Sequence, residues 1–116
     1  MANKLDFARA LVYARCKGYC EKCGRQLPDS WALHHRKLRS RGGKDEVCNF
    51  VALHHSCHNM ATDSVHFNPT DAQNKGLMVA SWENPLACPL TLPDGSIVTL
   101  TEKGTYNFLE RKSDGW

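Results

Sequence analysis

The sequence predicts an α+β protein with an N-terminal helix, a Cys-x2-Cys knuckle, a β-hairpin followed by a helix, and short C-terminal strands. Two observations carry this prediction: apolar residues recur at helical spacing near the N-terminus, and two paired Cys/His motifs flank two short apolar runs. A chain of 116 residues suits one domain. We therefore expect residues 1–116 to form a single domain with its core at 20–64 and a β extension over 65–116.

The first helix is expected to begin at Lys4, because the side chain of Asn3 can cap it and Asp6 lies near its positive end. Gly18 is placed to end it. Its apolar stripe consists of Leu5, Ala8, Leu11, Val12 and Cys16. Since Cys16 falls on this stripe, we expect it in the core rather than at a metal.

Two short strands with a basic loop between them are expected in the middle of the chain. Residues 31–35 and 50–53 have the length and composition of strands, and the sequence RKLRSRGGK follows the first of them. The paired glycines Gly42 and Gly43 in this loop indicate an unusual turn. Residues 55–64 are expected to form a helix that packs on the hairpin.

The C-terminal half is expected to hold one helical turn and several strands. The turn starts near Thr70 and ends at Gly76. Pro93-Asp94-Gly95 favours a tight turn between the last two strands. The expected strands cover residues 77–81, 90–92 and 97–101.

Charge is distributed unevenly along the chain. Residues 1–60 carry 11 Lys/Arg and 5 Asp/Glu, a balance of +6, whereas residues 61–116 carry 4 and 7, a balance of −3. A basic half can provide a surface for a polyanion. No apolar run approaches the roughly 18 residues of a membrane span, and the N-terminus lacks a signal-peptide core. We expect a cytoplasmic protein with no membrane partner. The paired spacing of its cysteines favours metal binding over disulfides.

Two pairs of metal-ligand residues predict a structural zinc site. Cys20-x2-Cys23 is followed by His54-x2-Cys57, and two short-spaced pairs of soft ligands are what tetrahedral Zn²⁺ requires. The hairpin lies between the pairs, so zinc would fasten its base to the knuckle. His55 competes with His54 for the fourth position, because the register is uncertain by one residue.

A second group of polar residues points to catalysis. His34 and His35 are adjacent, and Asn49 and His58 follow in the pattern H-x13-N-x8-H counted from His35. Neighbouring residues on a strand point to opposite faces. One histidine can therefore bind a metal while the other polarises a water molecule.

The segment from Cys20 to Asn59 resembles an HNH endonuclease of the zinc-bearing kind, in which a ββα-metal motif lies between two zinc-ligand pairs. The resemblance covers about a third of the chain, and outside it the sequence is loosely similar to small phage-encoded HNH proteins. The matching residues are Cys20, Cys23, His34-His35, Ser40-Arg41-Gly42-Gly43, Asn49-Phe50-Val51-Ala52-Leu53 and Cys57-His58-Asn59.

The resemblance implies roles for the four polar residues. His35 corresponds to the general base, Asn49 to the residue that braces the loop and orients that base, and His58 to a ligand of the catalytic divalent cation. His34 occupies the position of a second cation ligand, which in the family is more often Asp. Because imidazole suits transition metals better than Mg²⁺, the cation could be Mn²⁺, Ni²⁺, Co²⁺ or Mg²⁺.

The activity implied is hydrolysis of DNA phosphodiester bonds with one cation, leaving 5′-phosphate and 3′-hydroxyl ends. The loop after His35 is expected to bind DNA phosphates through Arg36, Lys37, Arg39, Arg41 and Lys44. Two alternatives stay open: a zinc-stabilised nucleic-acid-binding protein without catalysis, and an accessory factor that acts with phage packaging proteins. If the chain is phage-encoded, we expect it in the host cytoplasm; its oligomeric state is left open.

Overall fold

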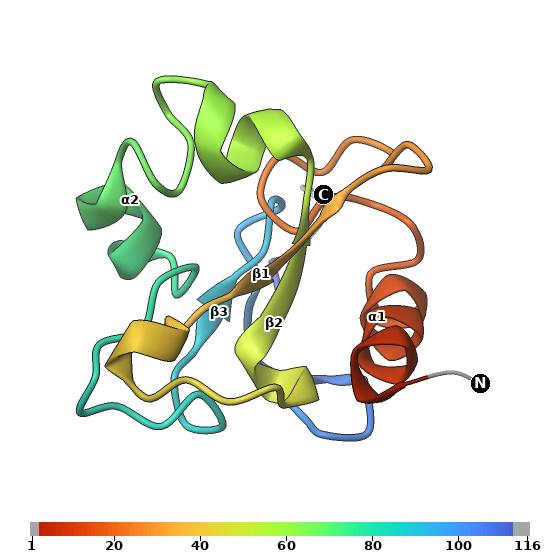
Figure 1. Ribbon diagram of the computed structural model, residues 1–116, viewed down its shortest axis with the longest axis vertical. Coiled ribbons are helices and arrows are strands. Elements are labelled where there is room, and N and C mark those ends of the chain that lie inside the picture. Colours follow the sequence, from red (N-terminus) through yellow and green to blue (C-terminus); the bar gives the residue numbers. More distant parts are fainter. Residues whose placement is uncertain (1–2, 113–116) are drawn as a thin grey trace.

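The computed structural model describes residues 3–112 and has the α+β composition expected from the sequence (Figure 1). The single-domain prediction also includes residues 1–2 and 113–116, which lie outside the described range. None of the described helices is long and apolar enough to cross a membrane. The elements are α1 (Lys4–Arg15), β1 (Ala32–His35), β2 (Phe50–Leu53), α2 (Pro69–Asn74), β3 (Leu90–Thr91), β4 (Ile97–Leu100) and β5 (Tyr106–Glu110).

Helix α1 begins as the sequence predicts. The Oδ1 atom of Asn3 accepts from the Asp6 amide at 2.8 Å, and the Asn3 amide donates to the Asp6 carboxylate at 3.3 Å, which completes a capping box. Ala8 and Val12 on its inner face are buried, whereas Leu5 at the first turn is exposed. The helix ends at Arg15, before the predicted stop at Gly18, whose φ of +81° turns the chain towards the knuckle.

Strands β1 and β2 form the predicted antiparallel hairpin in the centre of the molecule (Figure 1). His34 lies opposite Val51 and His35 opposite Phe50. Every residue of β2 is buried, so this strand is the axis of the core. The two histidines alternate in burial, which places their side chains on opposite faces of the hairpin.

The predicted helix over 55–64 is replaced by a shorter and wider turn. Residues Ser56–Met60 form one π-helical turn, in which the Ala61 amide donates to the Ser56 carbonyl at 3.0 Å. Ala61 then adopts an extended conformation, which ends the helical run. The wide turn carries Cys57 and His58, and the chain continues as turns to α2.

The predicted strand over 77–81 is absent from the described chain, while a strand that was not predicted, β5, closes the C-terminal sheet. Residues 77–80 are buried as their apolar character suggests. Their amides, however, bond to single carbonyls: Leu77 donates to Ala72 at 2.8 Å and Val79 to Arg36 at 2.8 Å. An apolar pattern reports burial and does not distinguish a strand from a buried irregular segment.

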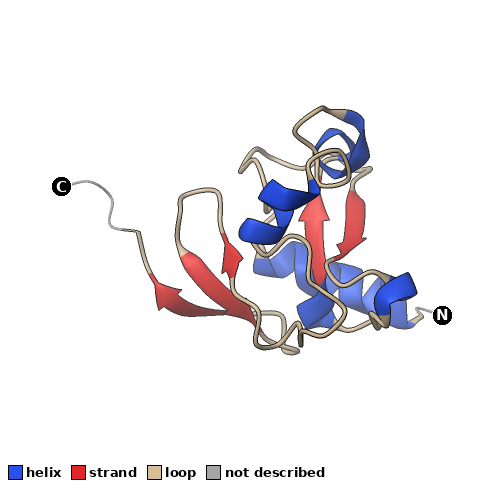
Figure 2. Cartoon of the chain, turned by 90° about the vertical axis from the view of Figure 1, so that its left-hand side faces the viewer, coloured by secondary structure: helices blue, strands red, loops and turns tan. Residues whose placement is uncertain are grey.

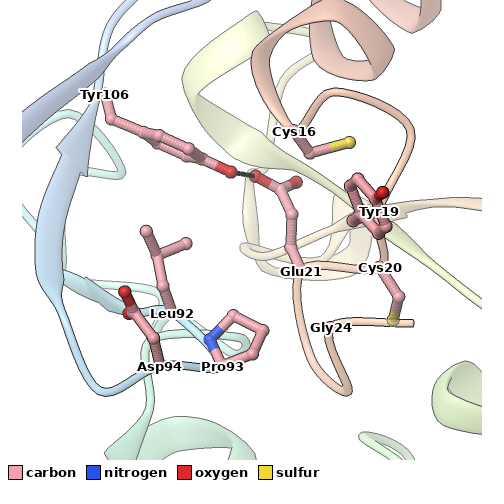
Figure 3. A pocket seen from close by; sticks show the side chains of 9 residues that line it. All are labelled: Cys16, Tyr19, Cys20, Glu21, Gly24, Leu92, Pro93, Asp94 and Tyr106. Atoms are coloured by element: carbon pink, nitrogen blue, oxygen red, sulfur yellow. Dashed lines mark hydrogen bonds between the residues drawn. The ribbon is translucent and has the colours of Figure 1, made fainter. Parts of the chain in front are cut away.

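The C-terminal sheet has the antiparallel order β3-β4-β5 and projects at one end of the molecule (Figure 2). A buried carboxylate fixes it to the knuckle. Glu21, 2% exposed, accepts from Tyr106 Oη at 2.6 Å and pairs with Arg15 at 2.7 Å (Figure 3 draws the bond to Tyr106). It also accepts from the Ala52 amide at 2.9 Å. One side chain thus joins α1, the knuckle, β2 and β5.

This network generates a prediction about stability. Glu21→Ala leaves the buried Arg15 guanidinium without its carboxylate, and we expect the free energy of unfolding to fall by about 3–5 kcal/mol. Tyr106→Phe removes one hydrogen bond, and we expect a loss of about 1–2 kcal/mol. Thermal or urea unfolding of zinc-loaded protein measures both. Equal effects of the two substitutions would contradict the assignment of Glu21 as the centre of the network.

Candidate metal centres and catalytic site

The structure brings Cys20, Cys23, His54 and Cys57 together, with one ligand atom from each within 4.8 Å of all the others. The knuckle presents the first pair, because the amides of Lys22 and Cys23 both point at Cys20 Sγ at 3.4 Å. The π-helical turn after β2 presents the second pair. Segments distant in sequence therefore converge on one point, as the spacing of the two pairs predicts.

His54, and not His55, faces the cysteines. Its Nδ1 atom lies 3.3 Å from Cys23 Sγ, and its Nε2 atom is 2.9 Å from the Gln26 carbonyl. An Nε2–H that donates to this carbonyl leaves the Nδ1 lone pair free for a metal. His55 is exposed and contacts Ser30 Oγ at 3.0 Å.

The chemistry of this donor set fits zinc. Burial, with the neighbouring Cys20 and Cys23, raises the pKa of Cys57 to about 12. Against the effect of burial, hydrogen bonds with Arg25 lower the pKa of Cys23 to about 6. Adjacent thiols therefore resist ionising together unless a cation balances their charge. A CysCysHisCys set of this kind is an established tetrahedral zinc environment.

A second cluster contains three imidazoles: His34, His58 and His66. Their ligand atoms lie within 4.8 Å of one another, and the Nε2 atoms of His58 and His66 are 3.1 Å apart. Two nitrogens this close together can bind one shared ion. His34 is 2% exposed, and its Nε2 atom is 2.9 Å from the Leu77 carbonyl, which leaves Nδ1 for the cluster.

His66 was not identified from the sequence. Two backbone hydrogen bonds hold its segment beside the π-helical turn. Val65 donates to the Cys57 carbonyl at 2.9 Å, and His66 donates to the His58 carbonyl at 3.1 Å. Of the six histidines, it was the one that the sequence motifs did not place at the zinc site or the catalytic site. No periodicity or motif spacing in the sequence indicates a role for His66.

The three-imidazole cluster has the protonation state that a metal needs. Burial, with the nearby His58, lowers the pKa of His34 to about 3. Burial, with His66, also lowers the pKa of His58. Both rings are neutral at neutral pH and can offer lone pairs. Neutral nitrogen ligands fit a transition metal better than Mg²⁺.

His35 faces away from this cluster and packs edge-on against Phe50, with the ring centroids 4.6 Å apart. Its Nε2 atom is 2.7 Å from Asp45 Oδ1, and Arg39 donates to both oxygens of that carboxylate at 3.0 Å. The hydrogen bond from His35, together with Arg39, lowers the pKa of Asp45. Asp45 was not singled out in the sequence, because a single acidic residue in a basic loop has no distinctive pattern.

Asn49 is fully buried and holds the loop between the strands at both of its ends. Its Oδ1 atom accepts from the Lys37 amide at 2.7 Å. Its Nδ2 atom donates to the carbonyls of Lys37 and Lys44, each at 3.0 Å. The loop that carries Arg39 and Asp45 is therefore closed by one amide side chain.

The expectation that Arg36 binds DNA is wrong, because its side chain is fully buried. The guanidinium donates at 2.7–3.1 Å to four backbone carbonyls, those of Cys48, Gly76, Pro85 and Cys88. Burial lowers the pKa of Arg36 to about 10, so the group stays charged at neutral pH. Its role is to hold segments of the chain together.

The other basic residues of the loop remain available to a ligand to different degrees. Arg39, Arg41 and Lys44 are exposed, although Arg39 is engaged with Asp45. Lys37 is half-buried and donates through Nζ to the Glu83 carbonyl at 3.0 Å.

Comparison with known proteins identifies one similarity. Residues 20–64 match the family described as HNH endonuclease, and this match covers the knuckle, the hairpin and the turn that carries His58. No curated protein and no solved structure matches the chain. A domain of this family indicates a nuclease-type function that uses divalent metal and acts on nucleic acid.

The cysteine cluster predicts one tightly bound zinc per chain. Cys57→Ala removes a ligand from the point where the knuckle meets the hairpin, and we expect loss of zinc with unfolding or aggregation. His55→Ala, at the exposed neighbouring histidine, is the matched control and should keep zinc and melting temperature. Elemental analysis and thermal melts measure both. Natively prepared, folded protein that contains no zinc would contradict this prediction.

Proposed function

From the HNH endonuclease domain at residues 20–64, we propose that the protein is a metal-dependent DNA endonuclease with His35 as general base. Hydrolysis would leave 5′-phosphate and 3′-hydroxyl ends. The main support is the division between adjacent side chains at the end of β1. His34 joins a cluster of three imidazoles, and His35 is paired with a carboxylate on the other face.

The Asp45 contact suits His35 to proton abstraction. A histidine that donates Nε2–H to Asp45 has its lone pair on Nδ1, where it can take a proton from water. Asp45 then balances the positive charge that forms on the ring. Arg39 orients this carboxylate by donating to both of its oxygens.

His34, His58 and His66 would hold the catalytic cation. When bound, such an ion neutralises charge on the scissile phosphate and on the departing 3′-oxygen. The protein contributes neutral nitrogen ligands and fixes the orientation of His34 through the Leu77 carbonyl. Asn49 holds the adjoining loop in place, so that Arg41 and Lys44 can contact phosphates of the same strand.

The alternative of a zinc-stabilised binding protein without catalysis accounts for less of this arrangement. The cysteine cluster and the exposed cations would serve binding alone. A cluster of three imidazoles next to an oriented Asp–His pair adds nothing to binding, whereas hydrolysis would use both. An accessory role beside phage packaging proteins would likewise use these groups only through nuclease activity.

Removing the proposed base should impair cleavage without impairing folding, zinc binding or DNA binding. His35→Ala should reduce plasmid cleavage by about 10²- to 10⁴-fold, the usual contribution of a positioned base. Zinc content, melting temperature and DNA affinity should change little, because His35 holds neither metal. His55→Ala should cleave like the wild type. A purified His35→Ala protein that nicks plasmid at the wild-type rate would refute the mechanism.

The proposal also predicts a transition-metal preference. Calorimetric titration of zinc-loaded protein with Mn²⁺ or Ni²⁺ should show one further site, weakened in both His58→Ala and His66→Ala. Zinc content should remain unchanged in these variants. His34→Asp should shift the preference towards Mg²⁺, a harder cation that favours carboxylate oxygen. Strict Mg²⁺ dependence of the wild type would contradict the three-imidazole assignment.

A further inference from the structure

Trp82 is the most exposed large apolar side chain in residues 3–112, at 83%. It lies in the loop between α2 and β3, outside the segment that matches the HNH family. Its indole presents a large aromatic face to a ligand. The mechanism proposed above does not use this residue.

The loop that carries Trp82 is held firmly against the hairpin. Arg36 donates to the carbonyls of Pro85 and Cys88 at 3.1 and 2.8 Å, and Lys37 Nζ donates to the Glu83 carbonyl at 3.0 Å. Glu83 also closes its own turn, since Oε1 accepts from the Ala80 amide at 3.2 Å. The tryptophan is thus presented from a fixed backbone, which lowers the cost of ordering it on binding.

Between Trp82 and the basic loop lies a cavity of about 450 Å³. Its wall on the loop side includes Lys37 and Lys44, whose backbones Asn49 holds. Lys37 comes two residues after His35. A nucleotide in this cavity therefore lies next to the loop that adjoins the proposed base.

The charges of the wall favour a nucleobase over a phosphate. Two lysines and two glutamates, Glu46 and Glu83, line the cavity. The carboxylates would repel an anion. The edge of a base carries both donors and acceptors, so the ammonium of Lys44 and the carboxylate of Glu46 can both bind it. An indole beside them provides a face on which a base can stack.

We propose that this cavity binds an unstacked base of the DNA strand, stacked on Trp82, so that the preferred substrate is single-stranded or locally open DNA. This inference rests on the proposed function and specifies its substrate. A base inside a duplex is paired and stacked on its neighbours, so reaching Trp82 costs unstacking energy that an unpaired strand does not require. Exposed cations of the loop would contact the phosphates on either side.

Binding of fluorescently labelled oligonucleotides tests the proposal, measured by anisotropy in a His35→Ala background so that the DNA stays intact. Trp82→Ala should weaken affinity for a single strand by about 5- to 100-fold, the usual effect of removing one stacking aromatic. Affinity for a blunt duplex of the same sequence should change much less. Trp82→Phe should retain most of the single-strand affinity. Phe7→Ala, an exposed aromatic on α1, is the matched control and should bind like the parent.

Equal single-strand affinity of the Trp82→Ala and parent proteins, with unchanged melting temperatures, would overturn the inference. Equal losses for single strand and duplex would overturn it too, because they indicate general contact rather than base stacking. Cleavage of plasmid and of the single-stranded oligonucleotide by the wild type is a separate readout of the proposed function. A wild type that cleaves DNA while Trp82 is dispensable contradicts this inference alone. Trp82-dependent binding without cleavage of either substrate contradicts the endonuclease proposal alone.

Discussion

The buried guanidinium of Arg36 is the contact on which the arrangement of the site depends. An isolated charge in a protein interior is strongly unfavourable, and here four carbonyl oxygens solvate it in place of water. Those carbonyls belong to the end of the loop between the strands, to Gly76 just beyond α2, and to the segment before β3. Because Arg36 directly follows β1, satisfying its donors draws three separate segments to the end of that strand.

The contacts of Arg36 also fix the main chain beside His34 and His35. The Arg36 amide donates to the Asn49 carbonyl and its own carbonyl accepts from Val79, so the main chain is fixed at the point where His34 and His35 diverge. The segment that Val79 belongs to also brings the Leu77 carbonyl to His34. The cysteine cluster lies on the other side, and the turn that holds Cys57 continues directly into His58. The structural centre and the three-imidazole cluster are thus linked through adjacent residues.

Local patterns in the sequence were sufficient for much of this structure. The Asn3 cap, the two strands of the hairpin and both halves of the cysteine cluster follow from short motifs with their own physical requirements. What could not be predicted depends on contacts between distant segments. The position of His66 is set by a backbone ladder to the π-helical turn, and the pairing of Asp45 with His35 by loop closure. Arg36 belongs to a basic run, and only the fold distinguishes a buried member from exposed ones.

The segment after residue 64 lies outside the HNH match, yet it supplies groups that the matched part lacks. It contributes His66 to the imidazole cluster, the Leu77 carbonyl that orients His34, and the carbonyls that solvate Arg36. Within the matched segment Arg36 has only the Cys48 carbonyl of its four partners, and His34 lacks the Leu77 carbonyl. The β3-β4-β5 sheet, in turn, is fastened by Tyr106 to Glu21 in the knuckle. The C-terminal segment therefore supplies three of the four carbonyl partners of Arg36 and the third imidazole of the candidate cluster.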